Sequence, residues 1–281
     1  MLKTRILTAL VIAPLVLCAL FLLPARGFGV AMLAITVQAS REWSRLAGFP
    51  AWGAWVFGGG ILLAGGALLF LPAWGFGRGW PADIVLAVCG TSALFWLFVA
   101  PFWVGRRWPT SGPWVMLACG AIVLLGTWMA LVELQARSPW LVLAAMAIVW
   151  IADTAAYFSG RAFGRRKLAP QISPGKTWEG VYGALAAVAV YALCLVPFAR
   201  DAGFGTEVGA PAVAVWVGFA LLLAAISVIG DLFESLLKRN AGVKDSGNLL
   251  PGHGGVLDRV DALLAAMPLA ALAAQWFLVK T

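Results

Sequence analysis

Nine apolar segments, each about as long as a membrane-spanning helix, follow one another along the 281-residue chain and constrain its fold more than any other feature. A helix needs roughly 20 mainly apolar residues to cross the hydrocarbon core of a bilayer. The segment at 25–40 is the weakest of the nine, because its apolar stretch is short and ends at Arg41 and Glu42. The full set is 5–23, 25–40, 52–72, 83–103, 113–133, 139–158, 180–198, 212–235 and 260–279. This pattern predicts an all-α polytopic integral membrane protein with about nine transmembrane helices.

The composition supports the lipid bilayer as the solvent of this chain. Hydrophobic residues make up 62% of it and charged residues 11%, against about 45–50% and about 25% in an average soluble domain. The segment 5–23 follows Lys3 and Arg5 like a signal peptide, but without a clear cleavage site, so we expect a retained anchor. The four cysteines lie singly in apolar runs and predict neither a disulfide nor a thiolate metal site.

The basic residues alternate between the two sides of the expected membrane. Of the 20 lysines and arginines, 15 fall on one side and 5 on the other, and the positive-inside rule assigns the richer side to the cytoplasm. The N-terminus and two polar loops, 159–179 and 236–259, then face the cytoplasm of a multi-pass membrane protein. If 25–40 did not cross, the N-terminus would change sides while the later loops kept theirs. The cytoplasmic loops therefore account for the net charge of +8, and we expect no nucleic-acid partner.

The acidic residues are few and lie where charges are costly. The chain has only 12, and carboxylates at membrane depth usually mark function. Asp153 lies within an apolar segment, Asp231 and Glu234 share a helix face, and Asp258 and Asp261 share another. Carboxylates gathered at one boundary repel unless a cation lies between them, and oxygen-only ligands suit Mg²⁺. The alternative is simple pairing with nearby lysines and arginines.

The loop 236–259 carries features of a phosphate-binding segment. Its run from Pro251 to Gly255 is glycine-rich and predicts exposed backbone N–H groups that could hold a phosphate, with Lys238, Arg239 and Lys244 adding positive charge. Within this run lies the only histidine of the chain, His253, flanked by glycines. A histidine in a polar loop at a lipid boundary has no evident packing role, so we expect it to be functional.

The loop 159–179 predicts a second phosphate or nucleotide contact. It contains Ser173, Lys176 and Thr177 in a stretch rich in glycine, proline and basic residues. The run Gly-Lys-Thr at its end is not a P-loop, because Pro170 stands where that motif needs glycine. The alternative is a loop that is basic only because it is cytoplasmic.

The segment from Ser235 to Asp261 resembles the signature of phosphatidate cytidylyltransferases, also known as CDP-diacylglycerol synthases. It contains Ser-x-x-Lys-Arg, Lys-Asp, Pro-Gly-His-Gly-Gly and Asp-Arg-x-Asp in that order. The segment 153–180 is similar to a second characteristic stretch of the family. The first 140 residues carry no motif that can be matched. We therefore divide the chain into N-terminal transmembrane helices (1–140) and a catalytic transmembrane region (141–281).

The resemblance implies that CTP and phosphatidate react to give CDP-diacylglycerol and diphosphate. It also implies a two-metal centre, with Mg²⁺ and possible use of a second cation, in which Asp231 and Asp258 are ligands and Asp261, Asp153 and Asp245 are weaker candidates. A homodimer is implied by the family alone. The expected catalytic residues are Asp231, Asp258, Asp261, Lys238, Arg239 and His253. The expected substrate-binding residues are Ser173, Lys176, Thr177, Lys244, Asp245, Gly254, Gly255 and Arg259, and the expected metal ligands are Asp231, Asp258, Asp261 and Asp153.

Two other classes of protein share some of these features. A CTP-using polyprenol kinase would have basic loops and acids but should lack the full His-Gly-Gly-x-x-Asp-Arg-x-Asp run. In a transporter, intramembrane acids would be ion sites, and broken helices would recur in two matching halves. The acids of this chain gather in one half instead, which favours the cytidylyltransferase.

Overall fold

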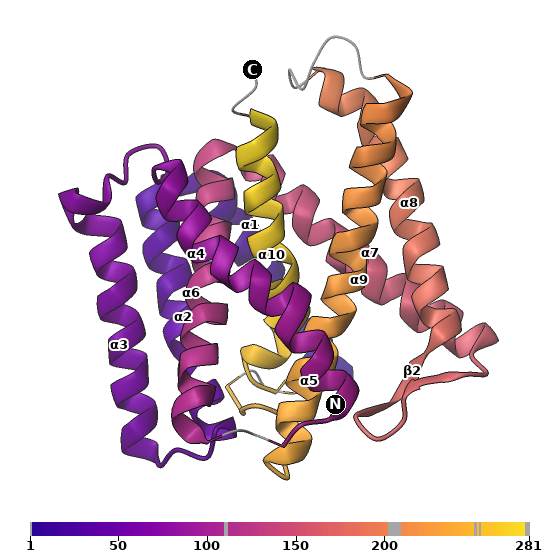
Figure 1. The fold of residues 1–281 in the computed structure, drawn as a ribbon, viewed down its shortest axis with the longest axis horizontal. Helices are drawn as coiled ribbons and strands as arrows, with labels where there is room; N and C mark the ends of the chain where they lie inside the picture. The colour runs from indigo at the N-terminus through magenta and orange to yellow at the C-terminus, as the bar shows by residue number, and fades with distance from the viewer. Residues whose placement is uncertain (1, 110–111, 202–208, 250–251, 253, 279–281) are drawn as a thin grey trace.

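The computed structural model describes residues 2–109, 112–201, 209–249, 252 and 254–278. Within these ranges the chain forms nine long helices, one of which is continuous through α4, a π-helical turn and α5 (Figure 1). The helices are α1 (Leu2–Leu22), α2 (Ala25–Leu46), α3 (Ala51–Phe70), α4 (Ala82–Leu94), η2 (Phe95–Val99), α5 (Ala100–Arg106), α6 (Pro113–Arg137), α7 (Pro139–Phe163), α8 (Trp178–Asp201), α9 (Ala210–Asn240) and α10 (Leu257–Leu278), with a short 3₁₀ helix η1 (Pro72–Trp74). The predicted all-helical architecture is confirmed.

Prolines define where many of these helices begin. Proline favours the first position of a helix, because its fixed φ suits the helix and its missing N–H would have had no partner there. Pro113 and Pro139 are the first residues of α6 and α7. Pro24, Pro50 and Pro81 stand immediately before α2, α3 and α4. The sequence positions of these prolines therefore separate consecutive apolar segments into distinct helices.

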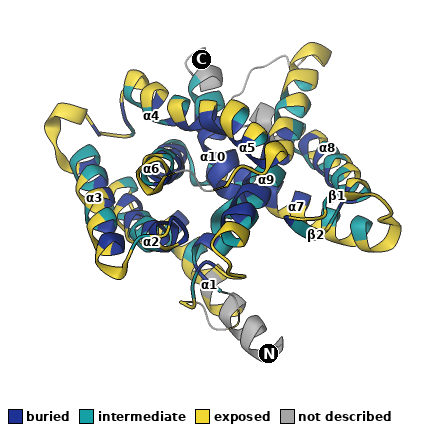
Figure 2. Ribbon diagram, turned by 60° about the horizontal axis from the view of Figure 1, so that its bottom comes forward, coloured by how far each residue is buried: buried dark blue, intermediate teal, exposed yellow. Residues whose placement is uncertain are grey.

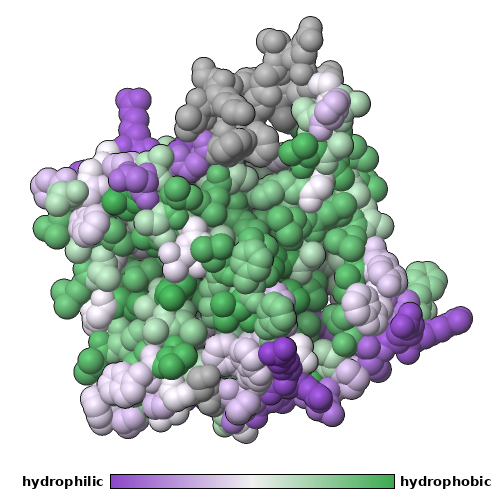
Figure 3. All heavy atoms as spheres, viewed as in Figure 1, coloured by the Kyte–Doolittle hydropathy of each residue, from purple (hydrophilic) through white to green (hydrophobic). Residues whose placement is uncertain are grey.

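Six helices among the described residues are long and apolar enough to cross a membrane: 51–70, 82–106, 113–137, 139–163, 178–197 and 210–240. The helices α1, α2 and α10 are not among the six, although all three were expected to span; of α1, the part from Ala13 to Leu22 is found as a shorter apolar helix. The other two have a common feature. Each carries three charges in a short stretch: Arg41, Glu42 and Arg45 at the end of α2, and Asp258, Arg259 and Asp261 at the start of α10. Figure 3 shows the hydrophobic band between more hydrophilic ends.

The helix α10 forms the centre of the bundle. Residues 262–271 are all buried, and α10 packs against α4, α6 and α9 (Figure 2). Its neighbours therefore come from both sides of residue 140, and the proposed division of the chain at that position stays a prediction. Because α10 is central, the acidic residues in its first turns lie inside the protein.

The polar loop between α7 and α8 contains a β-hairpin that the sequence patterns did not predict. Strands β1 (Lys167–Ala169) and β2 (Ser173–Thr177) are antiparallel, with Lys167 opposite Thr177 and Ala169 opposite Ser173. The hairpin lies at the same end of the bundle as the loop after α9 (Figure 1). The two polar loops are thus close in space although about 70 residues separate them in sequence.

Small residues let α7 and α8 approach closely beneath this hairpin. A Cβ atom on Gly180 would lie 2.9 Å from the carbonyl oxygen of Ala156. Thr177, which is buried, accepts a hydrogen bond at its hydroxyl from the Gly180 amide (3.2 Å). The hairpin is therefore fixed to the start of α8 by a turn that has no room for a larger residue at 180.

Candidate active site

The last turns of α9 present three charged side chains toward α10. Asp231, Glu234 and Lys238 are spaced by three and four residues, so they share one face of the helix. The Lys238 ammonium lies 2.5 Å from Glu234 Oε2 and 2.7 Å from Asp258 Oδ1. The Glu234 and Asp258 side chains are 2% and 4% exposed. Lys238 therefore neutralises two buried carboxylates from different helices at once, and joins α9 to α10.

Asp258 is held on its other side by the loop that precedes α10. Its Oδ2 atom accepts hydrogen bonds from the Ser246 amide (2.9 Å), the Ser246 hydroxyl (3.0 Å) and the Gly255 amide (2.8 Å). With Lys238 on Oδ1, both oxygens of Asp258 have donors within the protein. A metal ion bound by Asp258 would have to share Oδ1 with Lys238.

The signature glycines leave room for these carboxylates. A Cβ on Gly254, whose φ is +83°, would lie 2.6 Å from Asp258 Oδ2. A Cβ on Gly255 would collide with Ser246 Oγ and Glu42 Oε2. The Gly255 amide is directed at Asp258, so in this structure it serves the internal network. Phosphate binding by Gly254 and Gly255 stays a prediction.

A second acidic group lies beside the first, under the hairpin. The Lys176 ammonium of β2 is 2.7 Å from Asp231 Oδ2, and Ser235 donates to Asp231 Oδ1 (3.3 Å). Asp261 lies near enough to Asp231 and Asp153 for their charges to interact, with Lys176 as the opposing charge. The hairpin, α7, α9 and α10 thus bring together one lysine and three of the predicted metal ligands.

The hairpin is tied to the end of α9 by further polar contacts. Arg239 Nε donates to the carbonyl of Ile172 (3.3 Å), which is buried in the turn of the hairpin. Asn240 donates to the carbonyl of Trp108 (3.2 Å), and Arg107 donates to Gln171. Arg239 therefore has a structural role in the hairpin's placement, besides the catalytic role that the sequence predicts.

The remaining predicted residues lie around this centre. Lys244, Asp245 and Arg259 are exposed, and Ser173 is half-buried at the start of β2. His253, the predicted catalytic histidine, lies outside the described residues. Their predicted contacts with substrates stay predictions.

The donor atoms of the acidic group suit a hard cation. Carboxylate oxygens are the ligands that Mg²⁺ prefers, and Asp153, Asp231 and Asp261 contribute only such oxygens. In the described part of the chain, Lys176 is the cation that pairs with this group, and three ionised carboxylates would carry more negative charge than its ammonium opposes, which a divalent ion would neutralise. Among the described residues, no three potential ligands already converge to metal-binding distance. The chemistry of the residues fits Mg²⁺, and the role of each as a ligand stays a prediction.

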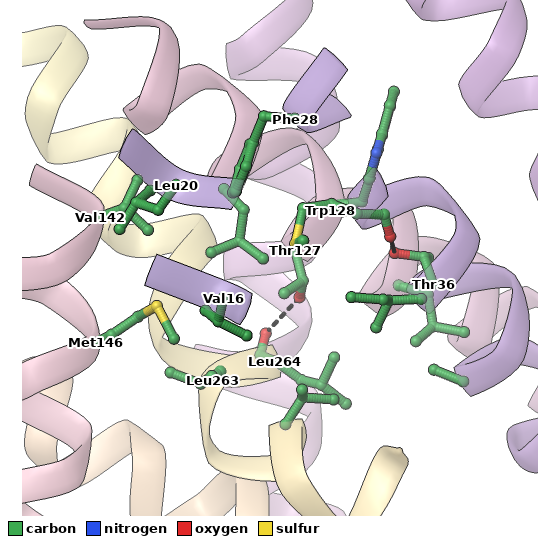
Figure 4. Close-up of a pocket in the computed structure, with 16 residues that line it drawn as sticks. Val16, Leu20, Phe28, Thr36, Thr127, Trp128, Val142, Met146, Leu263 and Leu264 are labelled. Atoms are coloured by element: carbon green, nitrogen blue, oxygen red, sulfur yellow. Dashed lines mark hydrogen bonds between the residues drawn. The ribbon is translucent and has the colours of Figure 1, made fainter. Parts of the chain in front are cut away.

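A separate cavity of about 130 Å³ lies between α1, α2, α6, α7 and α10 (Figure 4). Its lining is apolar except for two threonines. The Thr127 hydroxyl lies 3.0 Å from the Leu264 carbonyl, and the Thr36 hydroxyl lies 2.8 Å from the Met32 carbonyl. Both hydroxyls are thus satisfied by the backbone. The cavity offers nothing to a charged nucleotide, so the polar cluster is the candidate active site.

Comparison with known proteins identifies the family of the chain. The model of the cytidylyltransferase family matches residues 3–277. The chain belongs to the cytidylyltransferase family. The phosphatidate cytidylyltransferase of Pseudomonas aeruginosa is 44% identical to it over 271 residues, or 95% of each chain. That of Haemophilus influenzae is 37% identical over 285 residues, covering 95% of this chain and 96% of its own. That of Brucella suis is 40% identical over 273 residues, covering 95% and 91%.

The family resemblance expected from the signature is therefore confirmed over nearly the whole chain. In this cytidylyltransferase-family chain, the structure also brings two residues that the sequence patterns missed, Glu42 and Ser246, into contact with the candidate site. Glu42 accepts four hydrogen bonds at the base of the site, among them one from Ser246. A signal for Glu42 was present, because an acid in an apolar helix is the same anomaly that marked Asp153. It was read only as the end of a weak span.

Proposed function

We propose that this chain is a phosphatidate cytidylyltransferase, which converts CTP and phosphatidate to CDP-diacylglycerol and diphosphate. The proposal rests on the names of full-length relatives at about 40% identity. The structural observation that carries it is the meeting of two distant lysines with adjacent acidic groups: Lys176 of the hairpin pairs with Asp231, and Lys238 of α9 lies between Glu234 and Asp258. Such a site can hold polyphosphate and cation together at the edge of the bilayer.

The reaction asks for little proton transfer and much charge neutralisation. A phosphate oxygen of phosphatidate attacks the α-phosphorus of CTP, and the bond from that phosphorus to the leaving diphosphate oxygen breaks. The nucleophile is already an anion, so positioning and electrostatics dominate catalysis, as in other phosphoryl transfers. Lys176, Arg239, Lys244 and Arg259 are the proposed phosphate contacts. Lys238 and Asp258 are proposed to hold the base of the site in register with them.

We propose that Mg²⁺ is bound by Asp231 and Asp261, with Asp153 beside them and Asp258 as a further candidate ligand. The ion would neutralise phosphate oxygens of the nucleotide. Lys176, which pairs with Asp231 in this structure, would then be available to a phosphate. The test is activity in excess chelator, restored by Mg²⁺ in preference to Zn²⁺. Full activity without a divalent ion would contradict this assignment.

The proposed location is the bacterial inner membrane, with nine crossings and both polar loops on the cytoplasmic side. The distribution of lysines and arginines supports this orientation. A soluble nucleotide could then meet a lipid that stays in the bilayer. A homodimer is proposed from the family resemblance alone, and light scattering of the detergent-solubilised protein measures it.

The decisive experiment is a CTP-dependent assay of purified protein in detergent, with labelled phosphatidate and resolved lipid products. We expect labelled CDP-diacylglycerol and an equal amount of diphosphate. Transfer of a single phosphate from CTP to a polyprenol, without a CDP-lipid, would identify the kinase instead. Absence of any CTP-dependent product, together with substrate-driven ion flux in vesicles, would support a transporter.

A further inference from the structure

Glu42, near the end of α2, reaches the site from the N-terminal half of the chain. Its carboxylate is fully buried and accepts from the amides of Val256 (3.1 Å) and Leu257 (2.8 Å). It also accepts from Gln38 Nε2 (3.0 Å) and from the Ser246 hydroxyl (3.0 Å). More than 200 residues of sequence separate Glu42 from three of these four donors. Because these contacts join parts of the chain that are far apart in sequence, they fix how α2 packs against the signature segment 235–261.

Two of the donors are backbone amides at the start of α10. The first N–H groups of a helix have no partner within the helix, and a carboxylate that accepts from them is favoured further by the helix dipole. Leu257 is the first residue of α10 and Asp258 is the second. Glu42 therefore acts as a cap, supplied by another helix, for the turn that carries Asp258.

Ser246 extends this contact to Asp258 itself. Its hydroxyl has a single hydrogen, which it shares between Glu42 Oε2 and Asp258 Oδ2, each 3.0 Å from Oγ, and its amide also donates to Asp258. The backbone packs tightly around this link, because a Cβ on Gly247 would lie 2.8 Å from Glu42 Oε1. The side chain of Ser246 thus connects Glu42 to Asp258, and the neighbouring backbone leaves no room for a larger residue at position 247.

We propose that Glu42 is a positioning residue for cytidylyl transfer, which acts by fixing Ser246 and the first turn of α10 so that Asp258 and Lys238 keep their orientation. Glu42 is buried and does not face a substrate, so it is not a catalytic residue. The proposal rests on the proposed function. It gives the N-terminal half of the chain, which carries no recognisable motif, a specific part in the active site.

A buried glutamate can also serve stability alone, and the chain offers a matched control for that role. Glu133 of α6 is 1% exposed and accepts from the Trp80 amide (2.9 Å), Arg137 Nε (3.0 Å) and Gln275 Nε2 (2.9 Å). It fixes the loop between α3 and α4, at the opposite end of the bundle from the hairpin (Figure 1). Glu133→Gln removes the same charge from another buried position away from the site, where the carboxylate also pairs with Arg137. A loss of stability at least as large as that of Glu42→Gln is therefore expected from the control.

The experiment compares Glu42→Gln with Glu133→Gln in purified, detergent-solubilised protein. Val256 and Leu257 donate to different oxygens of Glu42, and glutamine places an NH2 group at one of these two positions, so one backbone amide would face a donor instead of an acceptor. We expect faster hydrogen–deuterium exchange in the peptide that covers Gly254 to Asp258 for Glu42→Gln only. We also expect kcat to fall about 10- to 100-fold, as a displacement of about 1 Å can cause, with KM for CTP changed less than about threefold.

Ser246→Ala removes the hydroxyl that connects Glu42 to Asp258 but leaves the hydrogen bonds from the Val256 and Leu257 amides to Glu42 in place. It should lower kcat while leaving exchange at the start of α10 close to wild type, and the double variant should lose little more than Glu42→Gln alone, because both act through one path. If Glu42→Gln does not fold, the kcat of Ser246→Ala decides: a wild-type value overturns the proposal.

Unchanged exchange in Glu42→Gln, or a kcat loss no larger than that of Glu133→Gln, would also overturn it. The exchange measurement needs no activity. A wild-type protein that forms no CDP-diacylglycerol would therefore refute the proposed function, whereas unchanged exchange would refute the cap.

Discussion

At the scale of single residues, Lys238 links the stability of the protein to the charge balance of the candidate site. It is the shared cation of two carboxylates that are almost completely buried, Glu234 and Asp258. Removing one partner from a buried ion pair leaves an uncompensated charge, which is far more destabilising than the pair is stabilising. The stability of the site and its chemistry are therefore linked through one ammonium group.

Lys238→Met should destabilise the folded protein by about 3–5 kcal/mol, because it leaves two buried carboxylates without their cation. Thermal unfolding in detergent measures this. Adding Glu234→Met to the same chain should recover part of the loss, since one of the two orphaned charges is then gone. Lys167→Met, on an exposed strand residue, is the control. An unchanged melting temperature for Lys238→Met would show that the two carboxylates do not depend on it.

Asp258→Asn should reduce turnover by about 10²-fold or more, because it removes the charge that Lys238 and a bound cation both require. The asparagine keeps the size of the side chain, so most of the protein should stay folded and inserted. The measurement is the CTP–phosphatidate assay with thermal unfolding as a folding control. A well-folded variant that kept more than about a tenth of the wild-type rate, a loss under ~1.4 kcal/mol, would remove Asp258 from the reacting centre.

At the scale of elements, the seam between α7 and α8 sets the position of the hairpin. Gly180 lies against the Ala156 carbonyl, and Thr177 caps the Gly180 amide from the end of β2. A shift of α8 along α7 would therefore move Lys176 away from Asp231. Packing at the start of α8 and the position of the Lys176 charge are therefore coupled through the short junction between β2 and α8.

Gly180→Val should cost about 1–3 kcal/mol of stability through overpacking and should also lower activity by displacing the hairpin. Gly218→Val is the matched control, because a Cβ on Gly218 of α9 would meet no neighbouring atom within 4 Å. Both variants make the same chemical change in a helix. Melting temperature and specific activity are compared side by side. Equal behaviour of the two would mean that the seam does not govern the hairpin.

The sequence predicted these elements unevenly, for physical reasons. Apolar length located all nine helices, because a bilayer imposes it on each segment independently. The ends were less accurate: α7 continues to Phe163 and α9 to Asn240, since helices extend past the hydrocarbon into polar surroundings. The hairpin was missed because its short strands have no regular alternation of polar and apolar residues. The role of Glu42 was missed because three of its four donors are more than 200 residues away, so its place in an apolar helix was read only as the end of a weak span.

At the scale of the whole molecule, the two polar loops share one end of the bundle (Figure 1), which makes a topology test simple. In a background without native cysteines, Asn248→Cys and Pro174→Cys should react with a membrane-impermeant thiol reagent in spheroplasts only after the membrane is permeabilised. Gly77→Cys, in the loop between α3 and α4, should react from outside. All three positions are exposed. Labelling of Asn248→Cys in intact cells would reverse the proposed orientation.

The cap that Glu42 provides has a consequence for how the chain is made. The chain enters the membrane from its N-terminus, so α2 is synthesised long before Val256 and Leu257 exist. Until α10 is present, Glu42 lacks the Val256 and Leu257 amides and has only Gln38 of its own helix as a donor among those described, and a carboxylate with so few donors opposes stable insertion of α2. We therefore expect stable insertion of α2 into the bilayer to depend on the insertion of α10. Although α2 is translated first, its carboxylate obtains the two backbone donors only after α10 has been made. The site is therefore complete only when α10 packs beside α2.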